Sequence, residues 1–218
     1  MTVQRVRDSL LPRVLAPWIP GSIHRGPARD SDGHPLFYLT VDDGPSASGT
    51  PLWLDVLGRH DARAVFFLSA PLALKHADLT RQLARSHRIG NHGWEHASGW
   101  RVRPGRVRRS MQDAEKALED LVGAPVRDVR PPYGRVTPAL VRWSARGRRI
   151  VLWDTMPGDF VASRPPADLA SELVALVRPG SIAVFHDGAP ASRAVAALDL
   201  ALPTLAAAGW RFPLLPAP

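Results

Sequence analysis

The sequence contains no cysteine. Disulfide bonds and thiolate metal sites are therefore excluded. A metal ion would have to bind through histidine, aspartate or glutamate, and the chain has 8 histidines and 20 acidic residues. A metal site in this protein is thus expected to use only nitrogen and oxygen ligands.

The sequence also lacks a run of about twenty apolar residues, so we expect no membrane-spanning helix. The apolar stretch at residues 10–20 is interrupted by Arg13 and by three prolines. These interruptions make it a poor core for a signal peptide. We therefore expect a cytoplasmic protein in which this segment packs over one end of the domain.

Lysine is scarce, since only Lys75 and Lys116 stand among the 28 basic residues, and the formal net charge is +8. A strongly basic chain can bind nucleic acid, anionic polymers or membrane surfaces. The arginines are spread along the sequence, however, and only residues 101–109 form a dense cluster. No nucleic-acid-binding motif accompanies them, so we interpret the charge as a compositional preference for arginine and expect no nucleic-acid partner.

The sequence does contain a regular alternation of strand and helix patterns. This alternation is typical of an α/β fold with a mainly parallel sheet, and we expect roughly seven strand–helix units, just short of an eightfold barrel. The Pro-, Gly- and Arg-rich residues 1–35 are expected to form an irregular lead-in, followed by one domain at residues 36–218. Strands are expected at residues 36–42, 64–68, 88–92, 126–130, 149–154, 181–187 and 210–213, and helices at 48–60, 77–86, 105–122, 137–146, 168–177 and 192–208.

Polar residues stand where five of these strands end. Because ligands bind at the carboxyl ends of strands in parallel α/β folds, we expect these polar groups to converge at one mouth. The five groups are Asp42-Asp43, residues 92–96, residues 130–134, residues 154–159 and His186-Asp187.

His92 and His96 are four residues apart, so both imidazoles can face one point on a turn. Together with a carboxylate they form a two-histidine, one-aspartate site with positions left for water. Such a site suits Zn²⁺ or a similar divalent ion. The pair alone is weak support for a metal site, because surface histidines at this spacing are common.

The order of the polar groups makes the pattern specific. Thr40-Val41-Asp42-Asp43-Gly44, His92-Gly93-Trp94-Glu95-His96, Arg130-Pro131-Pro132-Tyr133-Gly134, Asp159-Phe160 and Val184-Phe185-His186 follow one another along the chain. In this series the chain resembles the polysaccharide deacetylase family, which is carbohydrate esterase family four and is also called the NodB-homology domain. The resemblance extends over residues 36–212, nearly the whole chain.

The resemblance implies a distorted (β/α) barrel that forms the catalytic domain at residues 36–218. It also implies metal-dependent removal of N-acetyl groups, with O-acetyl groups as a second option, from an amino-sugar-containing oligo- or polysaccharide. By this resemblance the metal ligands are Asp43, His92 and His96. The ion is expected to be Zn²⁺, with Co²⁺, Mn²⁺ or Ni²⁺ as alternatives.

The resemblance also implies roles for the other residues of the series. Asp42 is the general base and His186 the general acid, while Arg130 holds Asp42 and Asp159 orients His186. The backbone N–H of Tyr133 stabilises the oxyanion. The substrate or acetyl pocket is lined by Tyr133, Pro132, Phe160 and Val184. This set agrees with the chemistry of amide hydrolysis, which needs an activated water, a charge sink and a proton for the leaving amine.

Four positions depart from the family pattern. Gly93 stands where serine or threonine is usual, which removes a hydroxyl that would brace residues 92–96, the segment that we call the metal loop. Phe160 replaces tryptophan and Val184 replaces leucine, so the acetyl pocket is expected to differ in shape. Met156 stands where the family often has an acidic residue. All expected metal ligands and both proton-transfer residues are nevertheless present.

Two alternatives remain open at the level of sequence. One is the same fold acting on a small, non-sugar C–N bond, which the absence of a carbohydrate-binding module also fits. The other is a non-catalytic domain that binds an anionic polymer through the cluster Arg101, Arg103, Arg106, Arg108 and Arg109. The second alternative predicts salt-sensitive binding that survives Asp42→Ala and His96→Ala.

Overall fold

The computed structural model describes residues 19–96 and 103–218 of the chain. The expected segment at residues 10–20 lies almost wholly outside these residues, as does Arg101. The strands are β1 (Ser22–Ile23), β2 (Tyr38–Asp42), β3 (Ala64–Leu68), β4 (Arg88–Asn91), β5 (Asp128–Val129), β6 (Arg149–Val151) and β7 (Ile182–His186). The helices are α2 (Thr50–Arg59), α3 (Ala70–Lys75), α4 (Ala77–Ser86), α5 (Pro104–Val122), α6 (Pro138–Ser144), α7 (Pro166–Leu176) and α8 (Ala191–Ala207), and a 3₁₀ turn spans Pro132–Gly134.

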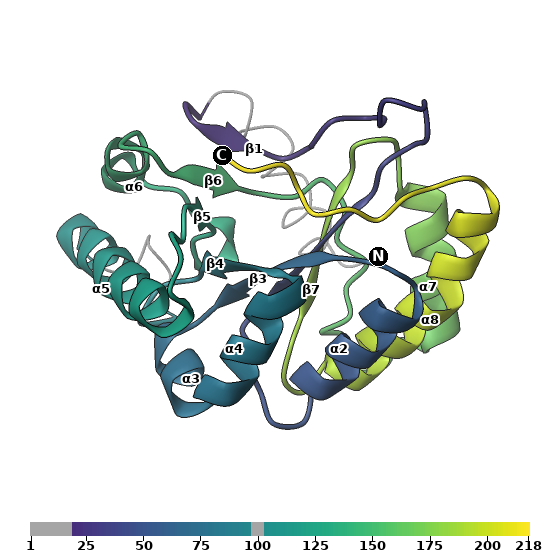
Figure 1. The fold of residues 1–218 in the computed structure, drawn as a ribbon, viewed down its shortest axis with the longest axis horizontal. Coiled ribbons are helices and arrows are strands. Elements are labelled where there is room, and N and C mark those ends of the chain that lie inside the picture. The colour runs from purple at the N-terminus through teal and green to yellow at the C-terminus, as the bar shows by residue number, and fades with distance from the viewer. Residues whose placement is uncertain (1–18, 97–102) are drawn as a thin grey trace.

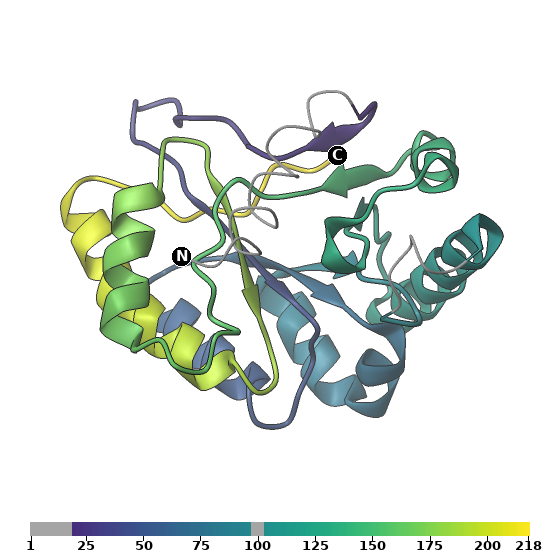
Figure 2. The same cartoon turned by 180° about the vertical axis from the view of Figure 1, so that it is seen from behind.

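The seven strands form one parallel sheet in the order β1-β6-β5-β4-β3-β2-β7. The sheet curls so far that its two edges are joined by isolated bridges. Thr155, beyond β6, pairs with Ala183 of β7, and Arg25, beyond β1, pairs with Ser181. The helices wrap the outside of this curled sheet (Figures 1 and 2). The expectation of a distorted, seven-stranded (β/α) barrel is confirmed.

Inward and outward side chains alternate along the central strands, as strand geometry requires. On β2, Leu39 and Val41 belong to the outer core between sheet and helices. Tyr38 faces inward and packs with Val184 of β7 and Trp153. Thr40 and Asp42 are the next inward-facing residues of β2 after Tyr38. The carboxyl end of β2 therefore places the Asp42 side chain inside the barrel.

The helix beginning at residue 138 shows how closely local sequence determines structure. Thr137 caps α6 by accepting a hydrogen bond at Oγ1 from the Leu140 N–H at 3.3 Å, and Pro138 occupies the first helical position. Proline suits this position because its missing N–H would have no partner within the helix. Thr137 is therefore the N-cap of the helix expected at residues 137–146.

Two expectations about the ends of the chain need correction. Residues 210–213 do not form a strand; Arg211 makes only an isolated bridge to Leu36, because Pro213 has no N–H with which to extend the ladder. The lead-in is not wholly irregular, since β1 pairs with β6 at the edge of the sheet. The C-terminal segment runs back across the barrel and ends beside β1 (Figures 1 and 2), where Arg149 Nη2 donates to the Pro216 carbonyl at 2.7 Å.

Within the two described stretches, no helix combines the length and the apolar composition that crossing a bilayer would require.

Candidate active site

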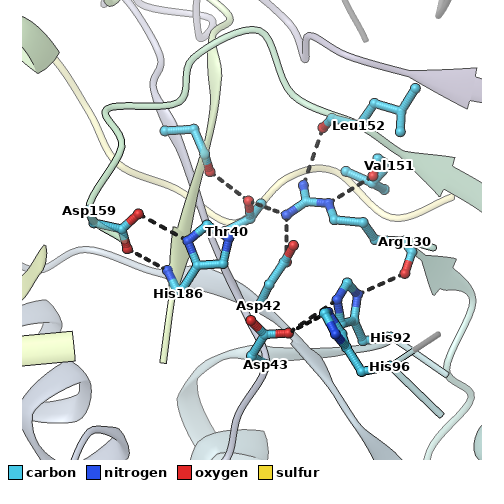
Figure 3. A network of polar contacts seen from close by, with 11 residues as sticks. Thr40, Asp42, Asp43, His92, His96, Arg130, Val151, Leu152, Asp159 and His186 are labelled. Carbon is cyan, nitrogen blue, oxygen red and sulfur yellow. Dashed lines mark hydrogen bonds and ion pairs between the residues drawn. The ribbon is translucent and has the colours of Figure 1, made fainter. Parts of the chain in front are cut away.

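The carboxyl ends of β2, β4, β5, β6 and β7 lie at the same end of the parallel barrel, and most of the expected polar residues meet there. Asp154 does not, because it accepts hydrogen bonds from Ser181 Oγ and the Ile182 N–H at the start of β7. In the register of β2 and β7, Asp42 lies directly beside His186. Figure 3 shows these two residues in one polar network with Asp43, His92 and His96. Two segments that are far apart in sequence thus contribute neighbouring titratable groups.

Arg130 is fully buried and anchors Asp42 to the barrel wall. Its Nη1 atom donates to Oδ1 of Asp42 at 2.8 Å and to Oγ1 of Thr40 at 2.7 Å. Its Nε and Nη2 atoms donate to the carbonyl oxygens of Val151 and Leu152, at 2.9 and 3.2 Å (Figure 3). Within the described part of the chain, no other side chain donates to the Asp42 carboxylate, so its second oxygen has no side-chain donor.

Asp43 turns away from this network because its backbone is left-handed, with φ = 70°. A non-glycine residue in this region is uncommon, and its strain is often found at functional sites. The turn places Asp43 Oδ1 3.4 Å from Nε2 of His92 and 3.1 Å from Nε2 of His96. The other ring nitrogen of His92 lies 2.8 Å from the Arg130 carbonyl oxygen, which fixes the direction of Nε2.

The two histidines determine the charge state of Asp43. Burial raises the pKa of Asp43, but hydrogen bonds and positive charge from His92 and His96 outweigh burial and hold the pKa well below its usual range. The hydrogen bond to Asp43 in turn raises the pKa of His96. Asp43 therefore remains ionised at neutral pH and attracts cationic groups to this point.

The residues Asp43, His92 and His96 fit a divalent metal ion. One ligand atom from each side chain lies within 4.8 Å of the others. Three protein ligands leave open coordination positions, as in catalytic zinc sites. The contact of His92 with a backbone carbonyl is typical of metal-binding histidines, because it fixes the tautomer and the ring orientation. The His92 side chain is 2% exposed and that of His96 41%, so the cluster opens to solvent on one side.

His186 is held on the other side of the two aspartates by Asp159 (Figure 3). Oδ1 of the fully buried Asp159 lies 3.0 Å from His186 Nδ1, and Oδ2 accepts from the His186 backbone N–H at 2.7 Å. Arg193 of α8 donates to the Asp159 carbonyl oxygen at 2.6 Å and ties this loop to the helix. Burial lowers the pKa of His186, but the hydrogen bond and charge of Asp159 outweigh it and raise the pKa to about 9.

Tyr133 lies in the 3₁₀ turn with φ = 60°. Like Asp43, it is a non-glycine residue of the site with a left-handed backbone. Its ring packs against His96 with centroids 4.8 Å apart. Pro132 before it is buried, so the turn is anchored while the Tyr133 ring is exposed.

Phe160 and Val184 have different surroundings, although we expect both to line one pocket. Phe160 is 45% exposed and meets His186 edge to face at 5.5 Å. Val184 is buried one inward position before His186 on β7, and packs with Trp153 and the partly buried Met156. Phe160 therefore lies at the rim of the site and Val184 at its floor.

Sequence reasoning missed how the metal loop is braced. Gly93 has φ = 95°, a conformation that side chains rarely adopt. The hydroxyl of Ser110, on α5, accepts from the backbone N–H groups of Trp94 at 2.9 Å and Glu95 at 3.1 Å. The loop thus receives a hydroxyl from a neighbouring helix, and no local sequence signal links Ser110 to it.

Asp187 is a second residue that the sequence-based assignment of roles omitted. It accepts from Ser46 Oγ at 2.8 Å and from Thr50 Oγ1 at 2.6 Å, while its own backbone N–H donates to the Asp42 carbonyl oxygen at 2.9 Å. These contacts fasten the loop after β2 to the end of β7. Asp187 therefore helps fix the backbone that carries both aspartates.

An Asp–His–His cluster at the mouth of a parallel barrel, beside a further carboxylate and an imidazole, is typical of metal-dependent hydrolases. The family model described as polysaccharide deacetylase matches residues 29–146. The chain belongs to this family. The expectation of a deacetylase-like hydrolase acting on carbon–nitrogen bonds is confirmed by this match and by its relatives.

Two curated relatives illustrate the similarity. A chitooligosaccharide deacetylase of Azorhizobium caulinodans is 34% identical over 204 residues, which cover 87% of this chain and 97% of that protein. A peptidoglycan-N-acetylglucosamine deacetylase of Bacillus cereus is 31% identical over 182 residues, which cover 82% of this chain and 66% of that protein.

Solved structures show the same fold. The Bc1960 peptidoglycan N-acetylglucosamine deacetylase, crystallised with 4-naphthalen-1-yl-N-oxidanyl-benzamide, superposes with a TM-score of 0.83 at 30% identity, covering 90% of this chain and 91% of that one. A family pseudoenzyme of Bacillus anthracis, BA3943, superposes with a TM-score of 0.78 at 22% identity, covering 90% of this chain and 68% of that one. The second similarity concerns the fold alone.

Proposed function

We propose that this protein is a divalent-metal-dependent deacetylase that removes N-acetyl groups from an amino-sugar-containing oligo- or polysaccharide. The observation that carries the proposal is the convergence of Asp43, His92 and His96 within 4.8 Å, next to the carboxylate of Asp42 and with the imidazole of His186 on the other side of the two aspartates. The relatives named as chitooligosaccharide and peptidoglycan N-acetylglucosamine deacetylases support an N-acetylated sugar as the substrate.

Asp43, His92 and His96 hold the metal ion in this proposal, with Zn²⁺ as the expected ion and Co²⁺, Mn²⁺ or Ni²⁺ as alternatives. A divalent ion in such a site acts as a Lewis acid on a carbonyl oxygen and lowers the pKa of water. The ionised Asp43 supplies the negative charge that retains the ion. The fixed tautomer of His92 directs Nε2 to the centre without reorganisation.

Asp42 is the general base in this proposal. Arg130 holds Oδ1 through a buried hydrogen bond of 2.8 Å, so the second oxygen is oriented to take a proton from water. His186 is the general acid, because a pKa of about 9 keeps its ring protonated at neutral pH. Its Nδ1 faces Asp159, which leaves the Nε2 proton for the leaving amine.

The tetrahedral transition state of amide hydrolysis also needs hydrogen-bond donors for its developing negative charge. We assign this role to the backbone N–H of Tyr133, whose left-handed backbone is the observation behind the assignment. The substrate contacts fall to Tyr133 and Pro132 on one side and to Phe160 and Val184 on the other. Valine and phenylalanine on the second side shape a pocket that differs from the usual leucine and tryptophan.

The fold alone does not establish catalysis, because BA3943 shares it and is described as a pseudoenzyme. The proposal therefore rests on the side chains, and both proton-transfer residues are present here with their orienting partners, Arg130 and Asp159. The same set would serve a small acetylated amine, so the assay has to compare the two kinds of substrate.

The test measures acetate release after removal of metal with a chelator and addition of Zn²⁺, Co²⁺, Mn²⁺ or Ni²⁺. Chitohexaose and N-acetylglucosamine-containing peptidoglycan represent the sugars, and N-acetylated alkylamines represent small amides. We expect metal-dependent release from at least one of the sugars and a much lower kcat/KM for the alkylamines. Absence of release from both sugars with every metal would refute the proposal. A higher kcat/KM for the alkylamines would instead support the alternative, in which the substrate is a small, non-sugar amide.

A further inference from the structure

A cavity of about 700 Å³ lies beside the metal loop, outside the residues assigned to catalysis. One wall is formed by Trp94 and Glu95, which lie between the expected ligands His92 and His96. The other wall is the amino-terminal half of α5. The lining residues are Trp94, Glu95, Arg103, Gly105, Arg106, Arg108, Arg109, Ser110 and Asp113.

Four of the residues that line this cavity are arginines, and all four are exposed. Arg106 binds Glu95 through two hydrogen bonds, of 2.9 and 3.1 Å. Arg103, Arg108 and Arg109 form no ion pair with any carboxylate in the described stretches. The cavity therefore combines one guanidinium neutralised by Glu95, three that form no ion pair in those stretches and one further carboxylate, that of Asp113, so positive charge remains in excess.

The carboxyl-terminal half of the same helix differs. There Glu115 of α5 binds Arg127 at 2.6 Å and Arg148 at 2.8 Å. Glu119 binds Arg127 as well, at 2.8 Å. A preference for arginine throughout the chain accounts for the number of arginines. It does not account for the arrangement in which carboxylates of the carboxyl-terminal half of α5 bind Arg127 and Arg148, while Arg108 and Arg109 in its amino-terminal half form no ion pair within the described stretches.

A second cavity, of about 420 Å³, continues the cationic surface toward α6. Arg108 lines both cavities, and the second adds Arg142 and Arg146. Among the residues that the structure describes, no acidic residue lines this second cavity. The two cavities thus form one basic surface, which begins beside the metal loop and extends away from it along α5.

We propose that this surface, which we call the arginine subsite, binds carboxylate or phosphate substituents on the glycan being deacetylated. The inference rests on the proposed function, because the same glycan has to reach the metal centre. Guanidinium groups bind carboxylates and phosphates through paired hydrogen bonds. The ring of Trp94 is 37% exposed and offers an apolar surface to a sugar ring at the junction of metal loop and subsite.

The position of the subsite favours a glycan over a membrane surface or a nucleic acid. Glu95 is directly adjacent to His96, so their Cα atoms are about 3.8 Å apart. A chain whose acetyl group reaches the metal centre therefore has its neighbouring sugars close to Trp94 and α5. The arginine subsite selects for acidic chains by lowering KM, while the acetyl pocket and the proton-transfer residues determine kcat.

The test compares two hexasaccharides, neutral chitohexaose and an acidic chain of alternating N-acetylglucosamine and glucuronate. Arg108→Ala/Arg109→Ala removes two charges from the subsite, and Arg85→Ala/Arg178→Ala removes two exposed charges elsewhere as a control. The zinc-loaded proteins are assayed for KM and kcat. Binding of both hexasaccharides is also measured by calorimetry, at low salt and at high salt.

We expect the subsite variant to raise KM and Kd for the acidic chain about fivefold at low salt. Values for chitohexaose should not change, and the control should resemble the unmodified protein. Equal effects of the two double variants on the acidic chain would overturn the subsite while leaving the deacetylase proposal intact. If neither chain releases acetate, the metal series with chitohexaose and peptidoglycan decides the deacetylase proposal, and the calorimetry decides separately whether the arginines recognise the acidic chain.

Discussion

Asp42 and Asp43 are adjacent in sequence, but their carboxylates have different partners. Oδ1 of Asp42 accepts from Arg130 at 2.8 Å inside the barrel, whereas Oδ1 of Asp43 lies 3.1 Å from His96 Nε2 in the cluster that opens to solvent. A regular strand would direct the two side chains to opposite faces of the sheet, but the left-handed backbone of Asp43 turns its carboxylate toward His92 and His96 at the barrel mouth. Two neighbouring carboxylates can thus perform two different tasks.

Substitution of each aspartate by asparagine should separate these tasks. Asp43→Asn removes the charge that retains the cation, so we expect zinc affinity to fall at least tenfold and activity to fall with it. Asp42→Asn removes the proposed base but no ligand, so we expect bound zinc to remain stoichiometric while kcat falls about 100-fold or more. Zinc content and affinity are measured by chelator competition, and kcat by acetate release.

The matched pair also serves as its own control, since each variant loses one carboxylate from the same turn. Near-normal turnover of Asp42→Asn would show that another group acts as the base. Full zinc affinity in Asp43→Asn would show that the expected ligand set is wrong.

The positions of the polar residues could be predicted because parallel strands collect their carboxyl ends at one place. The alternation of patterns predicted six of the seven strands, and the order of short polar groups then indicated the family. The strand β1 escaped prediction because its two residues, Ser22 and Ile23, are too few for a period-2 pattern. It exists only because its backbone can pair with β6 at the edge of the sheet.

Contacts between distant segments could not be predicted. Ser110 braces the metal loop across the interface between α5 and that loop, and neither its type nor its spacing marks it out. Arg193 similarly holds the Asp159 loop from α8. Such bonds depend on how helices pack onto the barrel, which local patterns do not determine. The different directions of the Asp42 and Asp43 side chains likewise depend on the left-handed backbone of Asp43, a conformation that the local sequence allows but does not determine.

The buried pair of Arg130 and Asp42 should contribute strongly to stability. Arg130→Met retains most of the side-chain volume but leaves the Asp42 carboxylate uncompensated inside the barrel. We expect the free energy of unfolding to fall by about 3–5 kcal/mol, measured by denaturant titration. Arg85→Met, at an exposed position on α4, should change it by less than about 0.5 kcal/mol.

The double variant Arg130→Met/Asp42→Asn distinguishes charge from packing. Neutralising Asp42 in the absence of Arg130 removes the unpaired charge, so the double variant should be more stable than Arg130→Met alone. If the two are equally stable, the loss comes from the bonds of Arg130 to the carbonyl oxygens of Val151 and Leu152 rather than from the ion pair.

Ser110 should tune the affinity of the metal loop without contacting the ion. Ser110→Ala removes the acceptor for the N–H groups of Trp94 and Glu95, which precede the ligand His96. We expect zinc affinity to fall about tenfold in a chelator competition assay, as is typical when support for a ligand is lost. Ser110→Thr keeps the hydroxyl and should restore most of the affinity. Ser86→Ala, exposed at the end of α4, serves as the control, and unchanged affinity of Ser110→Ala would contradict the bracing role.

The elevated pKa of His186 makes a prediction for the metal-free protein. Its pKa is raised from 6.5 to about 9 on folding, so the folded state holds the proton more tightly than the unfolded chain. This contribution to stability is fully present below about pH 6.5 and is lost as pH rises through about 9. The destabilisation caused by His186→Gln should therefore be larger at pH 6 than at pH 10, by on the order of 2–3 kcal/mol.

Asp159→Asn provides the control for this pH dependence, because the carboxylate is the main group that raises the pKa of His186. In that background the His186 pKa should fall toward its ordinary value, measured by NMR titration of the imidazole C–H protons. The destabilisation by His186→Gln should then become nearly independent of pH. An equal effect of His186→Gln at pH 6 and pH 10 in the otherwise unmodified protein would show that folding does not raise the pKa of His186 above 6.5. Most His186 rings would then be neutral above pH 7 and would lack the proton for the leaving amine.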